Sequence, residues 1–221
     1  MMSNDIKASL IIAISSIGSS DGKLDSKVER DLYLKNEPNS CPYIQITVKK
    51  VKTGKERKDG SQKEKAGLEL NIGDKIIPVS FVSTDQTFLY IINLIALKEG
   101  RSIQPSRFLP LEKEETKYNE SVYLVDRKRR QKLISWLRKR YNALNFSTDF
   151  DVWYDTVKNN PHRLHNAIGG IRRTLWNILK ENDCKEAFYY CALRNDNNRY
   201  WMRISKSNIR IDPEILVRFS R

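Results

Sequence analysis

The chain has 221 residues, which is enough for one or two domains with a hydrophobic core. Its 40 lysine and arginine residues outnumber the 27 aspartate and glutamate residues, which gives a formal net charge of +13. This excess favours nucleic acid as the partner. An anionic membrane surface, or a basic protein with no polyanionic partner, are the alternatives.

The first 40 residues are expected to form an N-terminal helical segment. Residues 4–17 have the composition of a short apolar helix, and their apolar run LIIAI is too short to span a membrane. Ser26 and Glu29 have the spacing of a capping box, which predicts a second helix to about Lys35. The start MMSND lacks the basic residues of a secretory signal, so we expect a cytoplasmic protein with no membrane partner.

Short strands should follow. Residues 43–51 alternate apolar and polar side chains, as a strand with one buried face does. The runs at 68–72 and 75–81 flank Gly73-Asp74 and predict a hairpin or two short strands, with Pro78 at an edge or a bend. Residues 53–67 are expected to form a charged loop. Basic residues gather in this loop and at the end of the preceding strand: Lys49, Lys50, Lys52, Lys55, Arg57, Lys58, Lys63 and Lys65.

A strong helix is expected next. Ser83 or Thr84 can cap its start and Gly100 can end it. Its apolar face consists of Phe88, Ile91, Ile92, Ile95 and Ala96.

Residues 110–149 are expected to be a helical insertion outside the core. The basic helix within it, 126–144, has an apolar edge that includes Trp136 and Leu137. Its cations Arg127, Arg129 and Arg130 are candidates for phosphate contact. A solvated helix is an equal alternative, and a membrane-surface helix is a further one.

The most informative helix is predicted at 162–179, after a short helix at 150–159 that Asn160-Pro161 ends. Leu164, Ile168, Ile171, Leu175 and Leu179 recur at helical spacing and predict a buried stripe. Two adjacent glycines interrupt the helix, each at a cost of about 0.8–1 kcal/mol relative to alanine. The opposite face carries His162, Asn166, Gly169, Arg173, Asn177 and Lys180.

This polar face suits DNA. Arginine pairs with guanine and asparagine with adenine in the major groove, and a glycine lets a bulky partner approach the backbone. A solvated face with a glycine kink is the alternative.

Two strands at 188–195 and 199–204 are expected to form an arginine-rich hairpin. A short helix, a tight break, a helix with polar groups outward and such a hairpin have the order of a winged helix-turn-helix. We therefore expect an α+β fold in which residues 41–221 form a winged helix-turn-helix. It would have N-terminal short strands, a C-terminal β-hairpin wing and the helical insertion.

The sequence resembles the OmpR/PhoB-type effector family of transcriptional regulators. LELNIGDKIIPVSFVSTDQTFLYIINLIALKEGRSI is similar to the start of that domain, HRLHNAIGGIRRTLWNIL to its recognition helix, and YYCALRNDNNRYWMRI to its wing. The similarity covers about 68–109 and 150–211. It implies that one set of residues faces DNA and that Arg194 and Arg199 lie in the wing. The DNA-facing set is Asn166, Gly169, Gly170, Arg173 and Asn177.

The chain departs from that family in three respects. About 40 residues separate the first helix from the helix-turn-helix, Arg199 stands where a glycine precedes the wing tyrosine, and no phosphoacceptor receiver domain is expected ahead of the domain. These departures leave no basis for control by phosphorylation.

Enzyme motifs are missing from the sequence. It has no P-loop, dinucleotide fingerprint, nucleophile elbow or H-E-x-x-H motif. Its three cysteines form no C-x-x-C pair, and His162 and His165 have no thiolate or acidic partner nearby in sequence, so we expect no metal and no cofactor.

We therefore expect a non-enzymatic transcriptional regulator that binds double-stranded DNA, with a homodimer left open. A plasmid or mobile-element replication initiator is the first alternative, and a nuclease or RNA-binding protein is the second.

Overall fold

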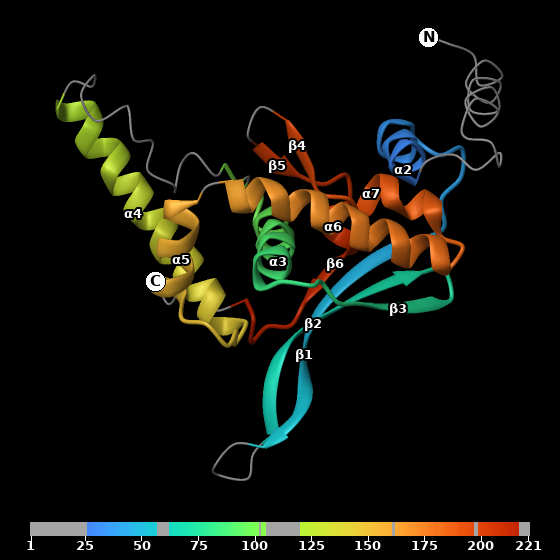
Figure 1. Cartoon of the computed structure of the whole chain (residues 1–221), viewed down its shortest axis with the longest axis horizontal. Helices are drawn as coiled ribbons and strands as arrows, with labels where there is room; N and C mark the ends of the chain where they lie inside the picture. Colours follow the sequence, from blue (N-terminus) through green and yellow to red (C-terminus); the bar gives the residue numbers. More distant parts are fainter. Residues whose placement is uncertain are drawn as a thin grey trace.

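The computed structural model describes residues 26–56, 62–101, 103–104, 120–160, 162–196 and 199–216, and it has a mixed α+β architecture (Figure 1). The expected helix at 4–17 lies outside these residues. The helices are α2 (Ser26–Lys35), α3 (Thr84–Lys98), α4 (Glu120–Ala143), α5 (Phe150–Asn159), α6 (His162–Glu181) and α7 (Phe188–Cys191). The strands are β1 (Ile44–Glu56), β2 (Gln62–Ile72), β3 (Lys75–Val79), β4 (Arg194–Asp196), β5 (Arg199–Trp201) and β6 (Ile209–Ile211).

A four-stranded mixed sheet has the order β3-β2-β1-β6. β1 pairs antiparallel with β2 and parallel with β6, and β2 pairs antiparallel with β3. The turn between β2 and β3 contains Gly73, whose φ of 56° lies in the left-handed region that glycine tolerates best. Pro78 lies in the edge strand β3, where its missing N–H costs no ladder hydrogen bond. The expected strands and the edge proline are therefore confirmed.

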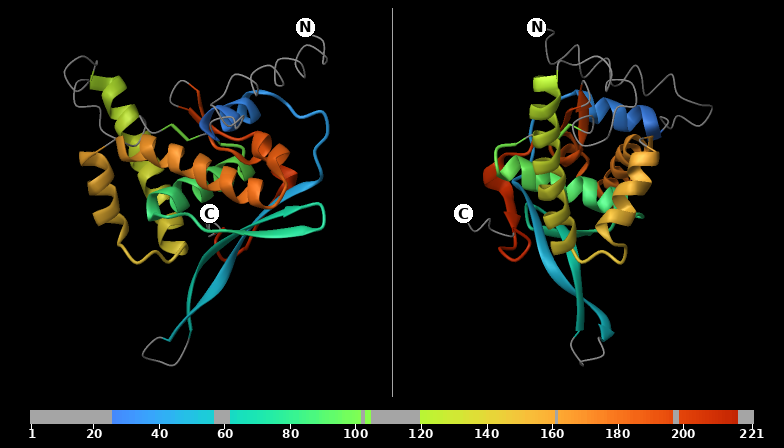
Figure 2. Two further views of the ribbon diagram at one scale, coloured as in Figure 1. Left: turned by 45° about the vertical axis from the view of Figure 1, so that its right-hand side comes forward. Right: turned by 90° about the vertical axis from the view of Figure 1, so that its left-hand side faces the viewer.

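The β1–β2 ribbon extends beyond the rest of the sheet as a two-stranded arm. β3 pairs with β2 only from Leu68 onward, and β6 pairs with β1 only as far as Val48. The ribbon continues to the pair Lys52–Glu64, and the views of Figures 1 and 2 show it projecting from the body. The expected charged loop at 53–67 was therefore too long, because cross-strand pairing carries both strands well into it.

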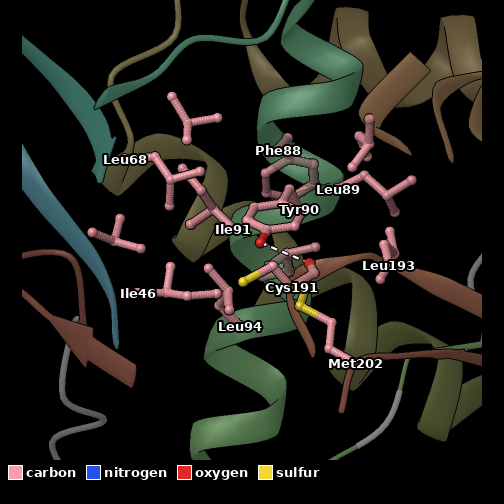
Figure 3. Close-up of a cluster of buried hydrophobic side chains, with 14 of the residues drawn as sticks. Ile46, Leu68, Phe88, Leu89, Tyr90, Ile91, Leu94, Cys191, Leu193 and Met202 are labelled. Atoms are coloured by element: carbon pink, nitrogen blue, oxygen red, sulfur yellow. Dashed lines mark hydrogen bonds between the residues drawn. The ribbon is translucent and has the colours of Figure 1, made fainter. Parts of the chain in front are cut away.

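Helix α3 forms the centre of the core. Ser83 caps its start, because the Ser83 hydroxyl accepts a hydrogen bond from the Gln86 N–H at 3.3 Å. Residues 88–96 are buried on every side of the helix, including the predicted apolar face. The fully buried Tyr90 hydroxyl donates to the Cys191 carbonyl at 2.9 Å, which satisfies a polar group deep in the core (Figure 3). The helix thus ties the sheet to the C-terminal part of the chain.

The C-terminal half of α4 also belongs to the core. Trp136 and Leu137 are 3% and 1% exposed, and Tyr141 joins an aromatic cluster with Phe88 and Trp153. The Trp136 indole N–H also donates to the Glu99 carboxylate at 3.2 Å, just beyond the end of α3. The expectation that 110–149 lies outside the core was therefore wrong for this part of α4, because its aromatic edge fills the space beside α3 and α5.

The segment at 188–191 is helical, contrary to the strand expected at 188–195. Phe188 packs edge-to-face on Trp176 of α6 with ring centroids 5.3 Å apart, and Cys191 is completely buried. Aromatic residues favour strands only when a sheet neighbour is available, and here helices α2 and α6 are the neighbours. The hairpin is consequently shorter than expected, with β4 and β5 of three residues each.

Candidate nucleic-acid interface

Helix α6 has one buried face and one exposed face, as its sequence predicts. The residues of the apolar stripe are all buried, with exposed fractions of 0–3%: Leu164, Ile168, Ile171, Leu175 and Leu179. The residues of the opposite face are all exposed: His162, Asn166, Gly169, Arg173, Asn177 and Lys180. The helix therefore presents hydrogen-bond donors and two cations, Arg173 and Lys180, to solvent along one side.

Helix α2 contacts α6 near the C-terminal end of α6. The Tyr33 ring lies 5.1 Å from the ring of Trp176, and the Glu29 carboxylate pairs with Lys180 at 2.9 Å and with Lys185 at 3.0 Å. Burial alone would raise the pKa of Glu29, but the hydrogen bonds from the two lysines outweigh it and lower this pKa. Lys180 is therefore held by a carboxylate and is a weaker candidate for a phosphate contact than the sequence suggested.

The two glycines of α6 have different environments. A Cβ at Gly169 would meet no atom within 4 Å, whereas a Cβ at Gly170 would lie 2.3 Å from Gln86 Nε2. The end of the Gln86 side chain of α3 thus occupies the space beside Gly170, which is half-buried and does not lie on the exposed face with Gly169. The implied DNA-facing role of Gly170 is a packing role in the structure, because its missing side chain makes room for Gln86.

A buried carboxylate sets the position of the first turn of α6. Asp85, which is 6% exposed in α3, accepts a hydrogen bond from Trp153 Nε1 of α5 at 2.9 Å. Its other oxygen accepts from Arg163 Nε of α6 at 2.7 Å. One side chain of α3 thereby joins α5 and α6, the two helices that precede and follow Asn160. Sequence reasoning missed this group, although an acidic residue in the first turn of a strongly apolar helix was a signal for it.

The β4–β5 hairpin presents one of the two arginines expected of it. Arg199 is exposed, but Arg194 is 8% exposed and donates to the carbonyl oxygens of Leu34 and Tyr189. The prediction that Arg194 contacts phosphate from an exposed wing is therefore corrected: its guanidinium lies under the hairpin and binds α2 and α7.

Sequence reasoning missed Arg203, which is exposed next to the hairpin. Alternation could have found it, because Tyr200, Met202 and Ile204 are buried at every second position. The hairpin is also anchored to the segment after α3, since the Tyr200 N–H donates to the Ile103 carbonyl at 3.0 Å.

Two further basic surfaces lie on other elements. Arg127 and Arg129 are exposed and Arg130 is half-buried in α4, which packs against α3 and α5. On the arm, Lys52 and Lys65 are exposed, while Lys49 and Lys50 pair with carboxylates. The structure therefore distributes positive charge over three elements and does not gather it around α6 alone.

Metal or thiol chemistry has no assembled site in the described residues. They contain no group of three or more histidine, cysteine, aspartate or glutamate side chains that could hold a metal ion. Cys184 and Cys191 are buried, and desolvation raises the pKa of both thiols. None of the helices in the described part of the chain is long and apolar enough to cross a bilayer.

Comparisons with protein-family models, curated proteins and solved structures yield no match to this chain. Its function is therefore inferred from the geometry of the described residues.

Proposed function

We propose that this chain binds duplex DNA and that α6 enters the major groove with its exposed face. The observation that carries the proposal is the composition of that face. Asn166, Gly169, Arg173 and Asn177 are exposed on one side of a helix whose other side is completely buried. Asparagine and arginine are the side chains that read adenine and guanine in this groove, which is wide enough to admit an α-helix.

We further propose that α5, α6 and the β4–β5 hairpin act as a winged helix-turn-helix. The order of helix, tight break, exposed helix and hairpin supports this interpretation. The Asp85 hydrogen bonds also support it, because a recognition helix must be held at a defined angle to the rest of its domain. The hairpin lies next in sequence after α6 and α7 and carries the exposed Arg199.

The charge of the chain favours the same partner. A net charge of +13, together with exposed lysines on the β1–β2 arm, favours a polyanion and predicts strongly salt-dependent binding. We propose regulation of transcription as the role and keep replication initiation as the alternative, since both roles use duplex binding of this kind.

The test is selection of bound sites from random duplex DNA, followed by binding measurements on Arg173→Ala. We expect this variant to lose about 1–3 kcal/mol of affinity for the selected site, the value of a bidentate arginine–guanine contact, and much less for random DNA. Arg210→Ala is the matched control, because Arg210 is an exposed arginine on the edge strand β6. Arg210→Ala should reduce the affinity for the selected site and for random DNA equally and only slightly.

Three outcomes would contradict the proposal. The first is no duplex binding at low salt, and the second is a preference for single-stranded RNA over duplex DNA. The third is an equal loss for Arg173→Ala on selected and random DNA, which would reduce α6 to a solvated helix. Magnesium-dependent cleavage of the bound duplex would instead indicate a nuclease.

A further inference from the structure

Three arginines come together beside the β4–β5 hairpin: Arg172 of α6, Arg194 of β4 and Arg203 after β5. The Arg194 Cζ atom lies 5.1 Å from the ring centroid of Tyr189 and 5.4 Å from that of Trp201. The Arg203 Cζ atom lies 4.3 Å and 5.5 Å from the same two centroids. Two guanidinium groups therefore share two aromatic rings, although like charges repel each other at this range.

Only some of the guanidinium N–H groups in this cluster donate hydrogen bonds. Arg172 Nε donates to the Leu193 carbonyl at 2.8 Å, and Arg203 donates to the Tyr189 hydroxyl. Nε of the buried Arg194 has no hydrogen-bond partner. None of the ion pairs formed among the described residues includes any of these three arginines.

Carboxylates do not balance the cluster. Asp31 and Asp196 are the acidic side chains that act on Arg172, and Arg30 of α2 adds a fourth guanidinium beside them. The Nε atom of Arg30 is also buried without a partner. Burial lowers the pKa of Arg172 and of Arg194, as expected where positive charge is poorly compensated. The four arginines therefore exceed the two aspartates by two positive charges in a partly buried cluster. A bound anion would offset the free-energy cost of desolvating these charges.

We propose that Arg172, Arg194 and Arg203 form a binding site for a phosphate group, and that a backbone phosphate of duplex DNA occupies it. The planar guanidinium fork matches phosphate oxygens and is less strongly hydrated than an ammonium group. Arg203 is exposed and Arg172 is half-buried, so an anion can reach the cluster from solvent, while Arg194 lies beneath. In naming DNA as the source of the phosphate, the inference rests on the proposed function.

The position of the cluster fits a contact beside the groove-reading face. Arg172 directly precedes Arg173, and successive residues of an α-helix differ by about 100° around its axis. The phosphate site therefore lies to one side of the exposed face of α6, toward the hairpin. A phosphate bound there would orient the helix and carry no sequence information, as backbone contacts generally do.

The test compares Arg203→Gln with Arg203→Lys and with the control Arg210→Gln in a salt titration of duplex binding. Arg203→Gln should reduce the affinity for selected and random duplexes alike, by about tenfold at low salt. It should also reduce the magnitude of the slope of log K against log salt by about 0.9. Arg203→Lys keeps the charge and should keep the slope, and Arg210→Gln should leave it unchanged. An unchanged slope in a folded Arg203→Gln protein would overturn the proposal. If that variant folds poorly, Arg172→Gln provides the same test from α6.

A second measurement separates this site from the proposed function. Pyrophosphate should raise the melting temperature of the wild-type chain, because a ligand that binds the folded state stabilises it, and should not raise that of Arg203→Gln. Suppose that pyrophosphate stabilises the wild type but not Arg203→Gln, and that the chain binds no duplex DNA. The proposed function is then wrong, and the cluster is a site for a free phosphate compound. Equal stabilisation of both proteins would overturn the site.

Discussion

Asp85 and Arg163 are joined by a 2.7 Å hydrogen-bonded ion pair that links the first turn of α3 to the first turn of α6. The two residues are 78 positions apart in the chain. Because the same carboxylate also holds Trp153 of α5, this pair sets how α5 and α6 lie relative to the core helix. This buried side chain therefore contributes, together with the packed apolar stripe of α6, to the angle of the proposed recognition helix.

Replacing Asp85 with asparagine should destabilise the fold. An asparagine side chain has only one acceptor oxygen, so either Trp153 or Arg163 loses its partner. We expect the free energy of unfolding to fall by about 1–3 kcal/mol. The measurement is urea denaturation of the full chain. Asp151→Asn is the control, because the Asp151–Arg138 pair is exposed and should contribute about 0–1 kcal/mol. An equal loss of unfolding free energy in Asp85→Asn and Asp151→Asn would show that the buried Asp85 contributes no more than an exposed carboxylate.

The two glycines of α6 should respond differently to alanine. Gly169→Ala should raise the free energy of unfolding by up to about 1 kcal/mol, because its Cβ enters open space in a helical backbone. Gly170→Ala should gain less or lose stability, because its Cβ displaces the Gln86 side chain. The double variant Gln86→Ala with Gly170→Ala should recover the gain in stability. Thermal melts of the wild type, Gln86→Ala, Gly170→Ala and the double variant measure the coupling between the two residues.

Gly169→Ala also tests how closely DNA approaches α6. If the backbone at Gly169 lies against the duplex, the added methyl group should weaken DNA binding in a protein that is more stable. Full affinity in the stabilised variant would mean that Gly169 has no part in the contact.

The contact between α2 and α6 should weaken in acid. Because the pKa of Glu29 is lowered in the folded state, its pairing with Lys180 and Lys185 is fully formed above the ordinary carboxyl pKa of 4.5. The contribution of this pairing to the free energy of unfolding is lost as the pH falls through the lowered pKa of Glu29 in the folded state. The stability difference between wild type and Glu29→Gln should be about 1 kcal/mol at neutral pH and should shrink below about pH 4.5. Glu214→Gln is the control, since the Glu214 side chain is 66% exposed in its pair with Lys50. A difference that grows in acid would contradict this assignment.

Helix α4 should prove essential to the core. Leu137→Ala removes a side chain that is 1% exposed and should cost about 2–5 kcal/mol, the transfer free energy plus the cavity left behind. Val152→Ala, at a site that is 59% exposed on α5, should change stability by no more than about 0.5 kcal/mol. Chemical denaturation of both variants decides whether residues 136–144 support the fold. A small loss at Leu137 would restore the interpretation of α4 as an appended helix.

Much of the local structure was determined by the sequence itself. The capping serine at 83, the apolar spacing of 162–179 and the turn at Gly73-Asp74 all depend on interactions within a few residues. For this reason the bounds of α5, the start of α3 and the two faces of α6 agree with their predictions. The exposed set on α6 followed from helical periodicity alone.

Only the tertiary structure decided which charged groups remain available. Lys180 and Arg194 look alike in the sequence as cations near a polar helix and a hairpin, yet α2 pairs with the first and buries the second. Likewise, a basic helix with an aromatic edge does not reveal that Trp136 fills the core. Each outcome depends on contact with a segment distant in the chain. Local periodicity carries no information about which segment that is, because the partner is chosen by the packing of the whole core.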